Sequence, residues 1–463
     1  MTPGHTPGDT PGDTPGYTII GAGPVGTLMA LMLAKRGHRV RVIERRADPR
    51  TGRIEDGRSI NLAMATRGLL ALEHAGLAGL IAPIMMPMPG RMLHDEHGAL
   101  QFLRYGQNEH EIIHAVSRER LNRILIDAAA QCPLIELRFD TRCLDLDLHA
   151  CRVKLRDERS GRSDSEPFEV LLGTDGAASA VRAALQARGL VRSHEQALAH
   201  DYKELRIAPD AARPGRFAFE PQALHIWPRG GYMLIALPNP DSSFTATLFL
   251  ARHGVPGFDQ LHTPDAVREF FAAQFGDAAR AIPDLAQQFA AHPQSRLGTL
   301  YCERWQIEGR VLLLGDAAHA IVPFHGQGLN CGFEDCRLLD GLLAGRPAGE
   351  PHVAAFERFE RERRPDTAAI AAMALENYEE MRESVRSPLF ARRQELASSL
   401  ERRFPGRFIP RYSMVMFHPE IGYAEAQRRG VAQQRVLDAL LAEGGPANAA
   451  ALSVEPLLDQ AGL

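Results

Sequence analysis

Three glycines near the start of the chain have the G-x-G-x-x-G spacing of a dinucleotide-binding turn, and they are Gly21, Gly23 and Gly26. In such a turn the first glycine permits a tight bend, the second lets a pyrophosphate approach the backbone, and the third lets the next helix pack closely. That helix directs unpaired N–H groups at the phosphates. Glu44 follows at the end of the next β-prone run, where a carboxylate can bind ribose hydroxyls. Arg45 and Arg46 could instead bind a 2′-phosphate, but Glu44 favours FAD or NAD over NADP in this site.

Two further motifs place a carboxylate where another strand is expected to end. Asp175-Gly176 follows a β-prone run and precedes a helical pattern, so Asp175 lies in a strand-to-helix turn. Asp316 follows a short apolar run, where its carboxylate can accept hydrogen bonds from polyol hydroxyls. Glycines shortly after it allow the backbone to approach a flat ring, and a helix expected from about Leu329 would stabilise negative charge on that ring.

The spacing of apolar residues predicts the elements that carry these motifs. Residues 17–20 and 39–43 read as strands, and the nearly continuous apolar run 25–35 reads as a buried helix between them, which gives a β-α-β unit. Between residues 205 and 250, strand-like runs separated by Pro, Gly, Asn and Asp indicate an antiparallel sheet inserted into the α/β domain. From about residue 351 the chain is charged, rich in Ala and Leu, and mostly helical.

Composition narrows the class of protein. The 463 residues carry 53 basic and 57 acidic side chains and a formal net charge of −4, which argues against a general nucleic-acid binder. No apolar run is long enough to span a membrane, and the N-terminus lacks the features of a signal peptide. The six cysteines form no CxxC pair or zinc-finger spacing, so we expect reduced thiols, no metal site and a cytoplasmic protein. Residues 1–16 repeat Thr-Pro-Gly and are expected to form a disordered tail.

In this order and spacing, the three motifs resemble the aromatic-hydroxylase family of FAD-dependent monooxygenases over roughly residues 17–350. The resemblance implies an α/β fold with a Rossmann-like FAD-binding domain, an inserted antiparallel-sheet substrate domain and a C-terminal helical region. The implied boundaries are 17–80, 108–185 and 296–350 for the discontinuous FAD-binding domain, 81–107 and 186–295 for the substrate domain, and 351–463 for the helical region.

The resemblance also implies which residues bind FAD. The three glycines of the turn cradle its pyrophosphate, Glu44 binds the adenosine ribose, and Arg118 lies near the pyrophosphate and the ribityl chain. Asp175 contacts both FAD and the passing nicotinamide cofactor, and Asp316 holds the ribityl chain. The residues implied to line the isoalloxazine ring are Gly328, Leu329 and Asn330. Because only one G-x-G-x-x-G is present, NADPH is expected as a transient reductant, although the sequence does not separate NADPH from NADH.

Several stretches are closer to bacterial members of the branch of this family that hydroxylates L-kynurenine, and these stretches are residues 57–63, 90–92, 120–125, 202–205, 223–228, 323–328, 374–378 and 408–415. The implied reaction inserts one atom of O₂ at carbon 3 of L-kynurenine through a flavin C4a-hydroperoxide. These bacterial members lack a C-terminal membrane anchor, and none is expected here. The implied substrate site consists of Arg91 for the carboxylate, Tyr105, Asn377 and Tyr412 as polar contacts, and Ile226, Phe324 and Met381 around the aryl ring.

The chemistry is expected to rest on the flavin, with no obligatory catalytic side chain. His325 is a candidate for proton transfer, but it is equally suited to shaping the roof of the substrate pocket. A homodimer is possible. Three other functions stay open: a phenol- or salicylate-type hydroxylase, an NAD-dependent dehydrogenase, and a non-enzymatic protein with FAD as a structural ligand or sensor. Arg91, Asn377 and Tyr412 argue against the first, and the Asp175 and Asp316 motifs argue against the second.

Overall fold

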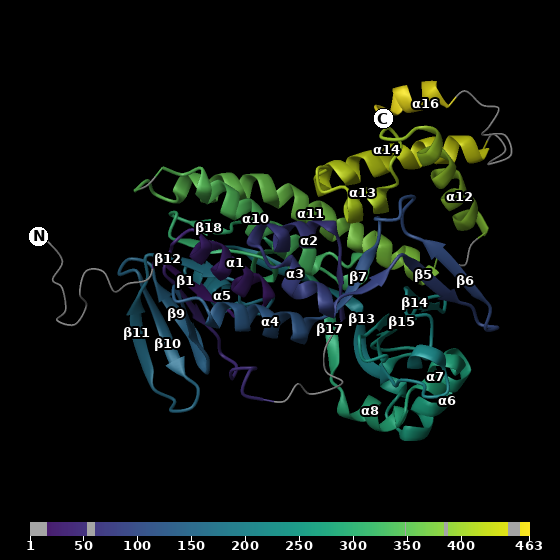
Figure 1. Cartoon of the computed structure of the whole chain (residues 1–463), viewed down its shortest axis with the longest axis horizontal. Coiled ribbons are helices and arrows are strands. Elements are labelled where there is room, and N and C mark those ends of the chain that lie inside the picture. The colour runs from purple at the N-terminus through teal and green to yellow at the C-terminus, as the bar shows by residue number, and fades with distance from the viewer. Residues whose placement is uncertain (1–15, 53–60, 348, 384–387, 443–453) are drawn as a thin grey trace, which may run out of the picture.

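The computed structural model describes residues 16–52, 61–347, 349–383, 388–442 and 454–463. Residues 1–15 of the expected tail, and residues 57–60 of one stretch that carries the resemblance, lie outside the described residues. The described chain forms two large sheets, each with helices beside it, and a group of helices near the C-terminus (Figure 1).

The first sheet has six strands in the order β18-β19-β12-β1-β2-β8, and all of them are parallel except β18. The strands are β1 (Tyr17–Ile20), β2 (Val40–Ile43), β8 (Ile135–Arg138), β12 (Val170–Gly173), β18 (Gln306–Ile307) and β19 (Val311–Leu313). Helix α1 (Pro24–Lys35) joins β1 to β2, so the predicted β-α-β unit is confirmed. Strands β1, β12 and β19 are buried along their whole length, as in a parallel sheet covered on both faces.

Helices and two small sheets surround the first sheet. Helix α1 packs against α4 (Arg118–Ala130) and α10 (Gly328–Ala344), and α10 also packs against α2 (Thr66–Ala75). Shorter helices in this part are α3 (Ala78–Ile81), α5 (Ala180–Ala187) and α9 (Asp316–His319). The two small sheets consist of β9 (Thr141–Asp147), β10 (Arg152–Asp157) and β11 (Ser163–Pro167), and of β3 (Asn61–Met64), β4 (Met86–Met88) and β7 (Ile113–Ser117).

The second sheet has seven strands in the order β17-β13-β16-β15-β14-β5-β6. Its strands are β5 (Gly90–His94), β6 (Leu100–Arg104), β13 (Ser193–Ile207), β14 (Ala223–Pro228), β15 (Met233–Pro238), β16 (Phe244–Ala251) and β17 (Gln294–Cys302). The predicted antiparallel sheet is confirmed with one exception, because β5 and β14 pair in parallel. The exception arises because β5 comes from a much earlier segment of the chain and not from a hairpin. The division of the chain into domains stays a prediction, and its boundary at residue 296 falls inside β17.

The two faces of the second sheet have different surroundings, because successive side chains along each strand point to opposite faces. One face packs against α6 (Pro264–Gln274), α7 (Gly276–Ala281) and α8 (Leu285–Ala291), which lie together in Figure 1. Trp227, Leu234 and Leu248 belong to that core. Residues in between, such as Ile226 and Ile235, face the opposite way and line a cavity.

The predicted C-terminal helical region is confirmed, and its helices are α11 (Val353–Glu383), α12 (Pro388–Arg403), α13 (Arg411–Phe417), α14 (Tyr423–Ala442) and α16 (Glu455–Ala461). The last four gather at one end of the molecule, coloured yellow-green to yellow in Figure 1. Leu400, Val436 and Leu458 belong to a separate small core there. None of the helices in the described part of the chain has the length and apolar character needed to cross a lipid bilayer.

A buried network of charged side chains joins α10 to the helices around it. Glu334 and Asp335 are neighbours on α10 and are both buried. Arg363 of α11 donates hydrogen bonds to Glu334 Oε2 and to Asp335 Oδ1, each at 2.9 Å. Arg67 of α2 donates to Glu334 Oε1 at 2.6 Å, and Nε2 of His319 lies 2.6 Å from Asp335 Oδ2. Buried charges are tolerated because each has a partner of opposite sign.

The same network extends to the chain between α13 and α14. Arg67 donates to the backbone carbonyls of His418 and Ile421, and its guanidinium lies 4.1 Å from the ring centroid of Tyr423. Burial lowers the pKa of His319, but the carboxylate of Asp335 outweighs burial and holds that pKa above its ordinary value. His319 is therefore a third cation in the network at neutral pH.

His319, Cys331 and Asp335 also bring potential metal-ligand atoms within 4.8 Å of one another. The Arg363 guanidinium already stands among them, with Nη2 3.3 Å from the Cys331 sulfur and Nε 2.9 Å from Asp335. The cluster is therefore best described as part of the ion network.

Replacing Arg363 by alanine should strongly destabilise the protein, because Glu334 and Asp335 would lose a buried partner. Breaking one side of a buried ion pair costs about 3–5 kcal/mol. Arg358→Ala is the matched control, because Arg358 lies on the same helix and its ion pair with Glu362 is exposed. Denaturant unfolding of the two variants measures the difference, and an Arg363→Ala protein as stable as the control would contradict this role.

Candidate active site

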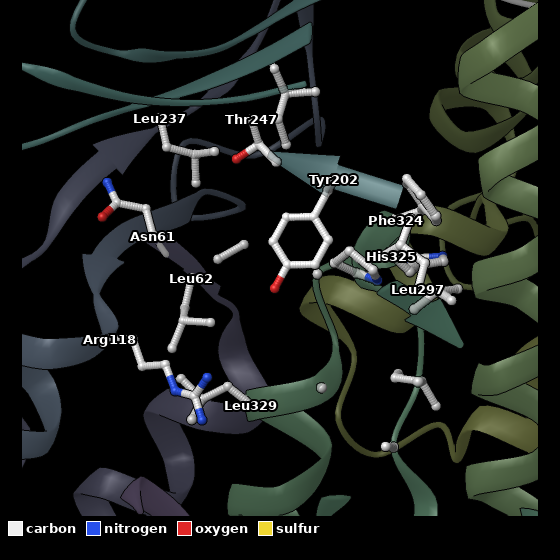
Figure 2. Close-up of a pocket in the computed structure, with 18 of the residues that line it drawn as sticks. Asn61, Leu62, Arg118, Tyr202, Leu237, Thr247, Leu297, Phe324, His325 and Leu329 are labelled. Atoms are coloured by element: carbon white, nitrogen blue, oxygen red, sulfur yellow. The ribbon is translucent and has the colours of Figure 1, made fainter. Parts of the chain in front are cut away.

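A cavity of about 450 Å³ lies beside the free face of the second sheet. Strands β13 to β17 form one wall, and the chain from Leu314 to Leu329 and the helices α11 and α13 form others. Figure 2 shows Thr247, Leu237 and Tyr202 on the sheet side, with Arg118 and Leu329 on the opposite side of the hollow. The cavity therefore runs between the two large sheets of the fold.

The glycine turn forms one end of this cavity. Gly21 has a φ of 106°, and a Cβ there would lie 2.7 Å from the carbonyl oxygen of Thr174. A Cβ on Gly26 would lie 2.1 Å from the carbonyl oxygen of Gly21, so both positions are packed too tightly for a side chain. Gly23 differs, since nothing lies within 4 Å of its Cβ position and it lines the cavity. With no side chain capping the start of α1, this turn fits a dinucleotide pyrophosphate.

Glu44 lies behind the same turn, at the end of β2. Its Oε2 accepts a hydrogen bond from the backbone N–H of Ala22 at 3.0 Å, and its Oε1 accepts one from the backbone N–H of Arg46 at 2.9 Å. Burial raises the pKa of Glu44, but the hydrogen bonds and charge of Arg46 outweigh it and hold the pKa below its ordinary value. The ionised carboxylate can thus accept hydrogen bonds from ribose hydroxyls. The Arg46 guanidinium donates a hydrogen bond to Glu44 at 2.9 Å, so it is not free to bind a 2′-phosphate.

A second cavity, of about 500 Å³, continues from the first. Both are lined by Pro24, Arg118, Tyr202 and Glu204, and Glu44 lines the second. Arg118 begins α4, and within the described ranges no carboxylate lies at ion-pair distance from it. An exposed, unpaired guanidinium between two cavities can bind an anion that spans both.

Two predicted cofactor-binding carboxylates have different surroundings. Asp316, at the start of α9, is exposed and lines the main cavity. Asp175 is not on the cavity wall: its Oδ2 accepts hydrogen bonds from the N–H groups of Ala180 and Val181 at the start of α5. Burial raises the pKa of Asp175, and among the described residues its buried Oδ1 has no hydrogen-bond partner. Contact between Asp175 and a cofactor stays a prediction.

The start of α10 forms the floor of the main cavity. Gly328 and Leu329 line it, whereas the side chain of Asn330 is directed into the protein. Its Oδ1 accepts from the N–H of Ala65 at 2.8 Å, and its Nδ2 donates to the carbonyl of Gly326 at 2.8 Å. Asn330 therefore fixes the shape of the floor. Of the three residues predicted to line the isoalloxazine ring, Gly328 and Leu329 are the two that can touch a ligand.

The opposite end of the cavity brings together Arg91, Tyr105 and Tyr412. The rings of Tyr105 and Tyr412 stack with centroids 5.3 Å apart. Burial raises the pKa of Tyr412 to about 12 and that of Tyr105 well above its ordinary value, so both are neutral phenols that can donate hydrogen bonds. In the described chain no carboxylate pairs with the half-buried Arg91. A guanidinium beside two hydroxyl donors can bind an anionic group such as a carboxylate.

His325 continues the aromatic stack. Its ring lies 5.3 Å from that of Tyr412 and nearly parallel to it. Burial lowers the pKa of His325 to about 4, with a small further effect of the positive charge on Arg411. The ring is therefore neutral at pH 7, and within the described chain its Nδ1 has no hydrogen-bond partner.

The middle of the cavity near this end is apolar. Ile226, Phe324 and Met381 are buried and line it together. Asn377, one helical turn before Met381 on α11, donates a hydrogen bond to the carbonyl oxygen of Phe324 at 2.5 Å. Asn377 thus holds the Phe324 segment, while the apolar side chains offer a dry surface to an aromatic ring.

All eight predicted substrate-site residues therefore line one cavity, although their roles stay predictions. Sequence reasoning missed Tyr202, Glu204 and Thr247, which also line it. The signal that could have found them is the two-residue period of β13 and β16, which puts alternate side chains on the same face.

Comparisons with known proteins agree with this geometry. A family described as FAD binding domain matches residues 14–374. The chain is 45% identical over 429 residues to kynurenine 3-monooxygenase of Myxococcus xanthus (strain DK1622), covering 93% of this chain and 91% of that protein. It is 44% identical over 420 residues to kynurenine 3-monooxygenase of Stenotrophomonas maltophilia (strain K279a), with 91% of each chain covered.

Solved structures share the fold at low sequence identity. p-Nitrophenol 4-monooxygenase PnpA from Pseudomonas putida DLL-E4 has a TM-score of 0.67 and 19% identity, covering 84% of this chain and 94% of that one. The tetrameric form of 2-methyl-3-hydroxypyridine-5-carboxylic acid oxygenase has a TM-score of 0.63 and 17% identity, covering 91% and 98%. The predicted fold class is confirmed.

The His325 ring should stay neutral from pH 8 down to about pH 5, because its pKa lies near 4. NMR of protein labelled in histidine measures this directly, and the signal that disappears in His325→Gln identifies the ring. A His325 signal that titrates between pH 6 and 7 would show that the ring is solvated, contrary to its buried position.

Proposed function

The chain belongs to the FAD-binding-domain family that contains the kynurenine 3-monooxygenases, and from this we infer that it is an FAD-dependent, NADPH-driven monooxygenase that hydroxylates L-kynurenine at carbon 3. The carrying observation is identity of 44–45% over at least 91% of the chain with relatives of that name. The geometry supports it, because one cavity has a dinucleotide turn at one end and, at the other, an arginine with no ion-pair partner among the described residues.

The residues present fit FAD. Gly23 and the start of α1 would hold the pyrophosphate, with Arg118 beside them, and Glu44 would bind the adenosine ribose. Asp316 would hold the ribityl chain, and Gly328 and Leu329 would lie against the isoalloxazine ring. When bound, FAD takes a hydride from NADPH and activates O₂ for insertion of one oxygen atom into an aromatic ring.

The protein holds the amino-acid end of the substrate. Arg91 can pair with the carboxylate through two parallel hydrogen bonds, and the neutral hydroxyls of Tyr105 and Tyr412 can donate to the same group. Since no carboxylate in the described ranges pairs with Arg91, the bound substrate would supply a partner for its positive charge. The carboxylate thus fixes one end of the substrate, and the position of the ring follows from the length between them.

The apolar walls position the aryl ring and exclude water. Ile226, Phe324 and Met381 would pack around the aminophenyl ring of L-kynurenine. The carbon ortho to the aniline nitrogen is electron-rich and is the atom that receives oxygen. These three side chains are uncharged, and His325 is neutral, so we propose no obligatory acid or base from the protein.

Other features stay proposals. We propose the discontinuous FAD-binding domain, the substrate domain and the helical region with the boundaries given above. A cytoplasmic location is supported by six cysteines that are all free. A homodimer is a further proposal without a described interface. The phenol- or salicylate-type alternative remains an outcome of the first experiment below.

Purified protein should oxidise NADPH much faster with L-kynurenine than without it, and the product should be heavier by one oxygen atom. Absorbance follows NADPH, and mass spectrometry identifies the product. Stimulation with hydrogen peroxide as the only oxygen product would make L-kynurenine an effector and not the substrate. A yellow protein that responds only to phenols would establish the alternative hydroxylase.

Arg91→Ala should raise the KM for L-kynurenine at least tenfold and leave FAD bound. Losing a charge-assisted hydrogen bond costs about 1.5–3 kcal/mol, and about 1.4 kcal/mol corresponds to tenfold. Arg104→Ala is the matched control, since Arg104 is an exposed arginine of the same sheet that does not line the cavity. Steady-state kinetics and the visible flavin spectrum give both readouts. An unchanged KM would remove Arg91 from the substrate site.

A further inference from the structure

Glu204 is a carboxyl group on the cavity wall that the proposed reaction does not use. It lies on β13 two residues after Tyr202, and both residues line the main cavity and the second cavity. Its partner across the sheet is Thr247 of β16, which also lines the main cavity. Glu204 therefore sits on the wall between the two cavities, on the side across from the glycine turn and Arg118.

The surroundings of Glu204 disfavour a carboxylate. Burial raises the pKa of Glu204 to about 7, and the positive charge of Arg118 only partly opposes this. No hydrogen bond to its side-chain oxygens occurs within the described chain, whereas its backbone carbonyl accepts one from Nδ1 of His292 at 2.7 Å. The other charged or titratable residues that line the two cavities are Glu44, Arg46, Arg91, Tyr105, Glu119, Tyr202, His292, Arg296, Asp316, His325 and Tyr412.

A dinucleotide changes this balance in one direction. Its pyrophosphate brings two negative charges to the region of Gly23 and Arg118. These charges neutralise Arg118, whose positive charge otherwise lowers the pKa of Glu204. A carboxylate next to the phosphates would repel them, whereas a protonated carboxyl can donate a hydrogen bond to a phosphate oxygen. The bound state therefore favours the protonated acid.

We propose that Glu204 binds a dinucleotide pyrophosphate as a neutral carboxylic acid, donating a hydrogen bond beside Arg118 and taking up one proton from solvent as the ligand enters. The proposal rests on the proposed function, because FAD and NADPH both carry a pyrophosphate and either can be the source. No covalent bond forms or breaks in this step. The proton that Glu204 gains returns to solvent when the ligand leaves.

Binding of FAD to the full chain tests the first source. For one proton and a free pKa of about 7, binding is strongest below pH 7, and the Kd should rise about tenfold from pH 6 to pH 8. In Glu204→Gln the amide donates at every pH, so the Kd should keep its pH 6 value at pH 8. Flavin fluorescence, which increases on release, measures the Kd.

Calorimetry separates proton uptake from a merely structural role. At pH 8, binding measured in two buffers of different ionisation enthalpy should show uptake of about 0.9 proton in the wild-type protein and none in Glu204→Gln. Glu195→Gln is the matched control and should behave as wild type, because Glu195 is an exposed residue of the same strand that lines neither cavity.

Binding of NADP⁺ to the FAD-loaded protein tests the second source with the same variants. A Glu204-dependent proton uptake in this arm alone would assign the site to the nicotinamide cofactor. The 2′-phosphate of NADP⁺ titrates equally with both proteins, so it cancels when the proton uptake of Glu204→Gln is subtracted from that of wild type. Equal proton uptake by wild type and Glu204→Gln in both arms would overturn the proposal while FAD binding and hydroxylation stayed intact. Failure to bind FAD at all would instead overturn the proposed function.

Discussion

The pairing of Glu334 and Asp335 with Arg67, Arg363 and His319 is the interaction on which the rest of the site depends. These side chains come from four helices, and all are buried. The adjacent carboxylates lie on α10, whose first turn forms the cavity floor. Since two neighbouring buried carboxylates are costly without cations, these pairs favour the arrangement in which the other helices dock on α10. The floor and the helices that wall the cavity are thereby set relative to one another.

The chemical character of the cavity above α10 changes along its length. At one end lie a backbone turn and Arg118, which has no ion-pair partner in the described chain, and at the other lie Arg91 and two neutral phenols. Apolar side chains such as Ile226, Phe324 and Met381 line part of the wall. Arg91 is half-buried and pairs with no carboxylate in the described chain, so a ligand with a complementary charge would offset part of the cost of its burial. Affinity and orientation therefore arise from the same groups.

Local patterns in the sequence predicted much of this. The glycine turn and the β-α-β unit depend on short-range spacing, and the structure confirms these elements. The resemblance gave eight residues that line one cavity, but the sequence could not give their distances, because they come from segments far apart in the chain. The sequence also could not predict where the side chains of Asn330 and Asp175 point. Each accepts a hydrogen bond from a backbone N–H group that only the fold brings close. Glu204 lies in a stretch that carries the resemblance, but no role was predicted for it, because its raised pKa comes from burial, which a motif does not encode.

The single parallel pair in the second sheet has a consequence for how the protein is made. Arg91 on β5 is held opposite Leu224 on β14, about 130 residues later in the chain. Closing a loop of that length must precede any benefit from the contact, so this pairing forms late compared with hairpins such as β14–β15. A ribosome-bound chain that already contains the complete glycine turn and β2 still lacks β14, the strand that pairs with β5 at Arg91. Since Tyr412 follows later still, the part of the cavity that contains Arg91, Tyr105 and Tyr412 is completed only when most of the chain has been made.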